Sequence, residues 1–225
     1  MKILNFGSLN IDYVYKVDKF ILPGETKSSL SLDTHCGGKG LNQSIAATKA
    51  GNEVYHAAFM GKGGEILKSA LSENGVNVDL IEQHEDMSGH AIIQVDEKGQ
   101  NCILLYGGTN QCLTKEFIDS ALDKFGNEGL VLLQNETNLV DYIINKSAEK
   151  GLMVALNAAP MNDKVFTYPL EKLSWLIVNE VEGRQIAKCD DDNDIIEILK
   201  KKYPKCKILL TLGSKGACCY ENYTQ

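Results

Sequence analysis

The chain has 225 residues, with 23 Lys and Arg against 30 Asp and Glu, which gives a net charge of −7. A hydrophobic share of 44% and a charged share of 24% are ordinary for globular proteins and exclude collagen, coiled coils and long disordered chains. No apolar run approaches the ~20 residues that a membrane helix needs, and the first residues turn polar too early for a signal peptide. An acidic chain without basic clusters is a poor match to nucleic acids or anionic membranes. We therefore expect a soluble, cytoplasmic protein that acts on a small molecule or on another protein.

In chain order, the N-terminal half mixes buried elements with exposed alternating strands. A buried strand is predicted over residues 2–9, followed by a polar alternating stretch that continues to residue 35. Helices are predicted over 39–50 and 65–73, with a strand over 53–60 between them. Residues 90–106 alternate around a turn at 96–99, which predicts a β-hairpin. The hairpin and the early alternating stretch indicate a small antiparallel flap over one end of the main domain.

The C-terminal half has a different rhythm of short apolar strands and amphipathic helices. The predicted strands are 130–133, 153–156, 175–178 and 208–212, and the predicted helices are 114–124, with Thr114 as N-cap, 138–150 and 195–202. Such alternation indicates parallel βαβ units with helices on both faces of the sheet. We therefore expect one α/β domain over 1–225, a three-layer α/β/α fold with a mostly parallel central sheet and a small antiparallel β-lid. The lid is expected at about 11–36 and 88–110.

Seven cysteines and four histidines raise the question of disulfides or a metal site. The cysteines are odd in number and form no CxxC pair, so reduced, mostly buried thiols are expected. The histidines show no HxH or HxxxH spacing, which gives a zinc site little support. The vicinal pair Cys218 and Cys219 falls in an apolar strand, where packing is the simpler interpretation.

Two polar segments near the N-terminus could bind a ligand together. Asn10 and Asp12 lie two apart after the first strand, so both side chains can face one ligand, and a carboxylate with a carboxamide suits neighbouring sugar hydroxyls. The alternative is an Asx-turn that closes the strand. The glycine-rich run 37–42 precedes a helix, and its free N–H groups can attract electron-rich oxygens. The alternative there is ordinary glycine punctuation before a helix.

Polar residues also follow several predicted parallel strands. In open α/β sheets, ligands bind at the carboxyl ends of the strands, where Glu136, Asn157, Asn179 and Glu182 fall. Residues 211–216 then supply a hydroxyl and glycines that could form a wall for a nucleotide, although a plain β-turn explains them as well. The glycine loop 61–64 lacks the GxGxxG spacing of a dinucleotide site, so a nicotinamide cofactor is not expected.

Taken in order, these motifs resemble the ribokinase branch of the PfkB carbohydrate kinase family along the whole chain. The segments that carry the resemblance are Gly7–Asp12, Pro23–Thr26, Gly37–Gln43, Tyr106–Asn110, Gln134–Glu136, Asn157–Pro160, Asn179–Glu182 and Thr211–Gly216.

The resemblance implies an ATP-dependent kinase that phosphorylates the primary 5-hydroxyl of D-ribose. By motif match, the residues assigned to the sugar are Asn10, Asp12, Gly38, Lys39, Gly40, Asn42 and Glu136. Those assigned to ATP are Asn179, Glu182, Thr211, Gly213, Ser214 and Gly216, with Glu182 positioning Mg²⁺ through water. The resemblance also implies a monovalent cation such as K⁺ in the complete protein and a homodimer formed through the lid.

The family pattern is interrupted at its catalytic motif. The GAGD segment, which supplies the base aspartate and the anion-binding amides, has no match in these 225 residues, so no aspartate here is assigned as the base. We therefore expect a domain truncated at its C-terminus, with little or no kinase activity of its own. The alternatives are a family kinase for fructose, a sugar acid or a nucleoside, or a non-catalytic sugar-binding relative.

Overall fold

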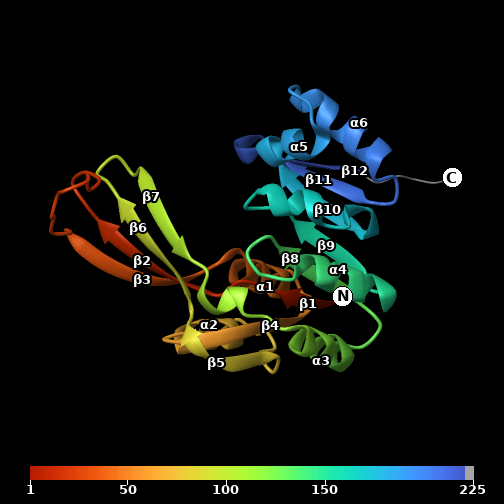
Figure 1. Cartoon of the computed structure of the whole chain (residues 1–225), viewed down its shortest axis with the longest axis horizontal. Coiled ribbons are helices and arrows are strands. Elements are labelled where there is room, and N and C mark those ends of the chain that lie inside the picture. Colours follow the sequence, from red (N-terminus) through yellow and green to blue (C-terminus); the bar gives the residue numbers. More distant parts are fainter. Residues whose placement is uncertain (221–225) are drawn as a thin grey trace.

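Eight strands form the central sheet of the computed structural model, which describes residues 1–220 (Figure 1). The strand order is β12-β11-β10-β9-β8-β1-β4-β5, and every neighbouring pair is parallel except β11 and β12. The predicted truncation concerns the C-terminal end of the chain, and residues 221–225 at that end lie outside the described residues. The strands are β1 (Lys2–Phe6), β4 (Glu53–Lys62), β5 (Ile81–Met87), β8 (Leu130–Gln134), β9 (Met153–Asn157), β10 (Trp175–Asn179), β11 (Lys207–Thr211) and β12 (Ala217–Tyr220).

Within residues 1–220, six α-helices connect or flank these strands. They are α1 (Lys39–Lys49), α2 (Glu65–Glu73), α3 (Lys115–Phe125), α4 (Val140–Glu149), α5 (Glu180–Ala187) and α6 (Asp192–Lys202). The same part of the chain contains four short 3₁₀ segments, namely η1 (Gly108–Gln111), η2 (Asp163–Thr167), η3 (Leu170–Lys172) and η4 (Gly213–Lys215). The Thr114 side chain accepts the Phe117 amide, which confirms the predicted cap of α3.

The helices cover both faces of the sheet and so confirm the predicted three-layer α/β/α fold. Strand β8 is buried along its whole length, as expected for an inner parallel strand. On one face, Leu41 of α1 and Leu67 of α2 pack into one apolar cluster. On the other face, α3, α4, α5 and α6 contribute to the larger cluster, with residues such as Ile118 and Ile143.

A second sheet projects from one side of the main domain and forms the β-lid (Figure 1). Its strands are β2 (Asn10–Lys16), β3 (Ser31–Gly37), β6 (Gly89–Val95) and β7 (Asn101–Tyr106). Strands β6 and β7 form the predicted antiparallel hairpin, and the early alternating stretch divides into β2 and β3, which also pair in antiparallel fashion. The two pairs join through a parallel ladder between β2 and β6, which the sequence pattern does not predict.

The cysteine prediction needs a correction. All seven thiols are unpaired, but only Cys206 is buried, whereas Cys102 and Cys219 are exposed. The expected burial was wrong because several cysteines lie on the lid and on edge strand β12, where one face of the strand meets solvent. Among residues 1–220, no helix combines the length and apolar character that a membrane crossing requires.

Candidate functional site

The start of β2 places Asn10 and Asp12 on one face of the lid, at its junction with the main domain. Asn10 is buried, and its Oδ1 accepts a 2.8 Å hydrogen bond from Asn110 Nδ2. Asn110 also accepts the Leu9 amide at 2.9 Å, so η1 fixes the chain where it leaves β1. Asn10 therefore has a fixed orientation.

Asp12 faces the glycine turn that leads into α1. A Cβ on Gly37 would lie 2.0 Å from Asp12 Oδ2, so only glycine allows this approach. Burial raises the pKa of Asp12 above its usual value, with a contribution from nearby Glu136, while His35 acts in the opposite direction. Among residues 1–220, no hydrogen bond to the Asp12 carboxylate is found, so its oxygens are free to accept bonds from a ligand.

Glu136 lies on the other side of the same turn. One of its carboxylate oxygens accepts the Ser8 hydroxyl and, at 2.9 Å, the backbone amide of Lys39. Its second oxygen lies 3.6 Å from Lys39 Nζ. The Glu136 side chain is only 10% exposed, so the carboxylate of this ion pair is largely buried.

The remaining predicted sugar ligands lie in the first turn of α1. The Gly40 amide donates to Ser8 Oγ at 3.1 Å, and the Asn42 amide donates to the Gly38 carbonyl at 3.1 Å. Asn42 is exposed. We call Asn10, Asp12, Lys39, Glu136 and the glycine turn 37–40 the β2–α1 site. The structure thus brings Asp12 and Lys39 to the same place, as the sequence hypothesis requires.

A buried polar network that the sequence did not reveal joins α1 to strands β1 and β4 and so supports this site. Asn5 donates to the Gly40 carbonyl and to Ser44 Oγ, both at 2.8 Å. Ser44 Oγ lies 2.8 Å from His56 Nδ1, and His56 Nε2 lies 3.1 Å from the Gly7 carbonyl. Because a carbonyl can only accept, Nε2 carries the ring proton. Burial lowers the pKa of His56 to about 4, so the ring is neutral at ordinary pH.

The predicted ATP residues gather at the carboxyl edge of the central sheet. The register places Asn179 opposite Thr211 on β10 and β11, and Gln134 opposite Asn157 on β8 and β9. Parallel strands therefore end together along one edge, where α/β folds bind ligands.

Asn179 and Glu182 form a reciprocal cap at the start of α5. Asn179 Oδ1 accepts the Glu182 amide and Glu182 Oε2 accepts the Asn179 amide, both at 2.9 Å. Glu182 is only 6% exposed. Its second carboxylate oxygen takes no hydrogen bond from residues 1–220. A capping box accounts for the local role of both residues and leaves one oxygen for another partner.

The segment from Thr211 to Gly216 turns the chain from β11 into β12. The Leu212 amide donates to the Gly216 carbonyl at 2.8 Å, which closes the turn around Gly213 and Ser214. Thr211 lies at the strand end, with Oγ1 3.4 Å from the Val178 carbonyl. We call Asn179, Glu182 and residues 211–216 the strand-end site.

The glycine loop after β4 has a structural explanation. The Gly61 amide donates to Ser88 Oγ at 2.9 Å, and a Cβ on Gly64 would lie 2.3 Å from that same oxygen. The loop therefore packs against Ser88, where the chain enters the lid at β6.

Comparison with solved structures places this architecture in a known class. The structure of ribokinase from Cryptococcus neoformans var. grubii in complex with ADP superposes with a TM-score of 0.82 at 30% identity, covering 100% of this chain and 76% of that one. The fold is therefore ribokinase-like, with a lid beside a three-layer domain.

Sequence comparison then defines the family. Residues 1–225 match the pfkB family carbohydrate kinase, and the chain belongs to this family. Haemophilus influenzae ribokinase is 28% identical over 222 residues, covering 93% of this chain and 71% of that protein. The bifunctional ribokinase/ribose-5-phosphate isomerase A of Fructilactobacillus sanfranciscensis is 31% identical over 230 residues, 96% of this chain but only 42% of that protein. The chain thus spans less than half of one relative and about seven-tenths of the other.

Proposed function

We propose that this protein is an ATP-dependent sugar kinase that transfers the γ-phosphoryl group to the primary 5-hydroxyl of D-ribose. The observation that carries the proposal is the β2–α1 site, where an unpartnered Asp12 carboxylate and Glu136 flank one glycine turn. Membership of the pfkB family and the similarity to ribokinases support the same conclusion.

In this proposal each residue of the β2–α1 site has a role in holding the sugar. The Asp12 and Glu136 carboxylates accept bonds from hydroxyl groups, and charged acceptors give the stronger hydrogen bonds. The side-chain oxygen of Asn10 accepts a hydrogen bond from Asn110, so its amide nitrogen is left to donate a hydrogen bond to the sugar. Gly38, Lys39, Gly40 and Asn42 line the same turn. The lid covers the sugar and excludes water that would compete for the phosphoryl group.

The strand-end site is proposed to hold the nucleotide. Thr211, Gly213, Ser214 and Gly216 would line ATP, and Asn179 would lie near its phosphates. Mg²⁺ prefers oxygen ligands and keeps several waters, and the Glu182 oxygen that the α5 cap leaves available fits a water-mediated contact. When bound, Mg²⁺ supplies charge neutralisation on the phosphates.

We also propose that residues 1–225 alone transfer little or no phosphate, because none of their aspartates matches the family base. A monovalent cation such as K⁺ is proposed for the complete protein. A coupled assay for ribose-dependent ADP formation tests the first point, and a rate equal to that of a longer gene product would contradict it.

Calorimetric titration of residues 1–225 with ribose tests the sugar site without requiring turnover. Replacing Asp12 with Asn removes a charged acceptor worth about 1.5–3 kcal/mol, so we expect ribose to bind roughly 10–100-fold more weakly. Asp33→Asn, an exposed carboxyl farther along the lid, is the matched control and should bind normally. Equal affinities for the Asp12 variant and the parent, or stronger binding of fructose or a nucleoside than of ribose, would contradict the assignment.

The lid is also proposed to form a homodimer. On the strand face that carries Asp12, the register places Val14, Ile93, Ile103 and Leu105. Ile103 is 56% exposed and Leu105 is 49% exposed. Neighbouring exposed apolar side chains of this kind are typical of a protein–protein interface.

Light scattering of two variants on β7 tests this face. Ile103→Asp should convert the dimer to a monomer, because it places a charge in the interface. Leu104→Asp, which alters a more exposed residue (69%) on the opposite face of the same strand, should leave the dimer intact. A monomeric parent protein, or dissociation by Leu104→Asp alone, would contradict the proposal.

A further inference from the structure

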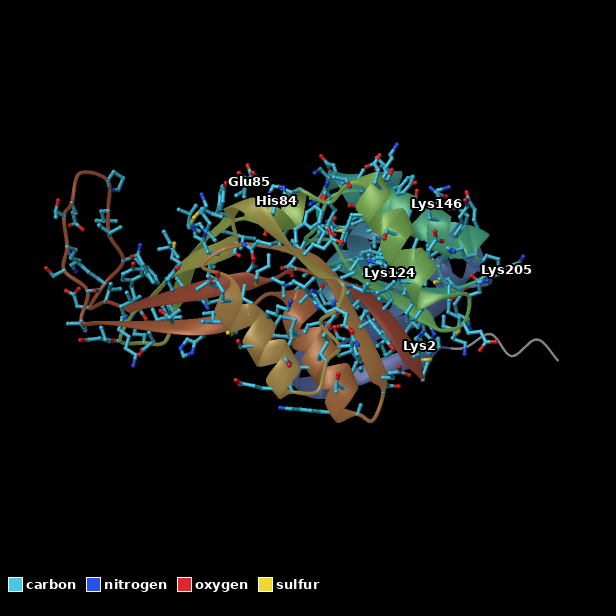
Figure 2. The ribbon with its side chains drawn as sticks, turned by 90° about the horizontal axis from the view of Figure 1, so that it is seen from below. Lys2, His84, Glu85, Lys124, Lys146 and Lys205 are labelled. Carbon is cyan, nitrogen blue, oxygen red and sulfur yellow. The ribbon has the colours of Figure 1, made fainter. Side chains whose placement is uncertain are left out.

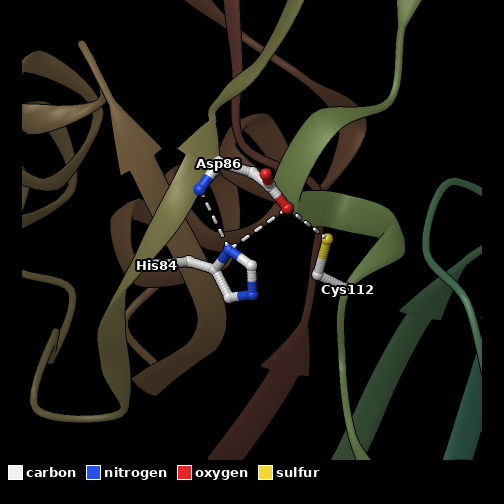
Figure 3. A group of neighbouring side chains, drawn as sticks. All are labelled: His84, Asp86 and Cys112. Atoms are coloured by element: carbon white, nitrogen blue, oxygen red, sulfur yellow. Dashed lines mark hydrogen bonds and ion pairs between the residues drawn. The ribbon is translucent and has the colours of Figure 1, made fainter.

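Three potential metal ligands from two separate segments of the chain meet at the root of the lid. They are His84 and Asp86 of β5 and Cys112, which directly follows η1 (Figure 3). The His84, Asp86 and Cys112 ligand atoms all lie within 4.8 Å of one another. Figure 2 shows the labelled His84 at the border between the lid and the main domain. Neither site described above uses these three side chains.

From this cluster, we propose that His84, Asp86 and Cys112 form a binding site for a divalent transition metal ion such as Zn²⁺. A nitrogen, an oxygen and a sulfur donor form the type of set that zinc and cobalt take, whereas Mg²⁺ and Ca²⁺ prefer oxygen alone. The ionised carboxylate and thiolate would together balance the charge of the cation. Water supplies the fourth position of a tetrahedral site.

The separations of the ligand atoms fit such a centre. With bonds of about 2.0–2.3 Å, tetrahedral geometry places ligand atoms about 3.3–3.6 Å apart. His84 Nδ1 lies 3.5 Å from Asp86 Oδ2, and Cys112 Sγ lies 3.7 Å from the same oxygen. The first separation lies in this range, the second is about 0.1 Å longer, and all three ligand atoms lie within 4.8 Å of one another, so a small contraction of the cluster would suit a bound ion.

The histidine ring is held with the correct nitrogen toward its partners. It stacks on the buried Phe59 ring, with centroids 5.3 Å apart. Nδ1 accepts the Asp86 amide at 3.2 Å, so Nε2 carries the proton and Nδ1 keeps its lone pair on the side of Asp86. Metal binding exchanges this long hydrogen bond for a coordination bond.

The position of the site suggests an effect on the lid. Asp86 lies just before β6, and Cys112 lies just after β7 and η1, so a bound ion would join the two ends of the β6–β7 hairpin. Asn110, two residues before Cys112, holds Asn10. Metal binding would therefore stiffen the root of the lid beside the β2–α1 site.

Titration with Co²⁺, a spectroscopic substitute for Zn²⁺, tests the site directly. The purified, reduced protein should bind one equivalent with a near-ultraviolet sulfur-to-cobalt charge-transfer absorption, and Zn²⁺ should displace it. Cys112→Ser should abolish that absorption, whereas Cys102→Ser, which removes an exposed thiol on β7, should keep it. His84→Gln and Asp86→Asn should each weaken binding at least about tenfold.

Circular dichroism of each variant establishes that it is folded. If Cys112→Ser does not fold, His84→Gln and Asp86→Asn still test the site, because they replace side chains that are partly or largely exposed. The proposal is overturned if the parent protein shows no charge-transfer absorption with equimolar Co²⁺. It is equally overturned if the absorption survives in folded Cys112→Ser, or if His84→Gln and Asp86→Asn both bind Co²⁺ as tightly as the parent.

Discussion

At the β2–α1 site, hydrogen bonds join residues that are far apart in the chain, whereas at the strand-end site most of them are local, with the contact from Thr211 to Val178 as the exception. Ser8 bonds to Glu136, 128 residues away, and Asn110 bonds to Asn10, 100 residues away. Asn179 and Glu182 cap one another from only 3 residues apart. The first site therefore rests on long-range side-chain contacts, while the second consists of a helix cap and a turn that the pairing of β10 with β11 brings side by side. Substitutions should affect the two regions differently.

The largest expected effect comes from the network beneath the β2–α1 site. The pKa of His56 is lowered to about 4 in the folded protein from 6.5, so only the unfolded chain takes up the proton between these values. Stability should be full above about pH 6.5 and should fall by about 3 kcal/mol as the pH drops to 4. Denaturant unfolding over a pH series measures this loss.

Two histidine variants make that measurement specific. His56→Gln should remove the pH-dependent loss, whatever its effect on absolute stability. His35→Gln, which alters an exposed lid histidine, should retain it. Parallel pH profiles for the parent and His56→Gln would show that the buried ring is not the cause.

The next largest expected effect is the difference in stability loss between two glycine substitutions, one in each site. A Cβ on Gly40 would lie 2.2 Å from the Ser8 nitrogen, so Gly40→Ala should cost about 2–3 kcal/mol and weaken ribose binding. Gly213 has nothing within 4 Å of such a Cβ and only a φ of +55°, so Gly213→Ala should cost about 1 kcal/mol. Thermal unfolding of both variants tests the difference, and equal losses would contradict it.

The smallest effect is expected at the cap of α5. Asn179→Ala removes one side of the capping box and should cost about 1 kcal/mol of stability without changing ribose affinity. Asn101→Ala, at the exposed start of β7, is the control and should stay within about 0.5 kcal/mol of the parent. A marked loss of ribose binding in Asn179→Ala would mean that the two sites are not independent.

The sequence pattern predicted most of the fold where periodicity was strong. Helix α2 has the predicted bounds, and the β6–β7 hairpin lies where its alternation placed it. Strand β5 was missed because most of its side chains are polar and exposed on a sheet edge. Helix α5 was also missed, although the Asn179-to-Glu182 spacing of a capping box is a usable signal for its start.

The candidate site was predictable only in part, because many of its contacts join residues that are far apart in the chain. Asn10, Asp12 and Glu136 could be chosen from motifs, and the structure brings them together. Ser8 and Asn110, which fix their positions, act across 128 and 100 residues, and no local pattern predicts such contacts. The His84, Asp86 and Cys112 cluster was missed in the same way, since its ligands come from two separate elements.

Hydrogen–deuterium exchange with ribose and no nucleotide tests most directly whether the β2–α1 site is preassembled by the fold. Ribose should slow exchange at the amides of residues 37–42 and at the start of β2, and it should leave residues 211–216 unchanged. Unchanged exchange at residues 37–42, or protection that appears only after ATP is added, would contradict the account.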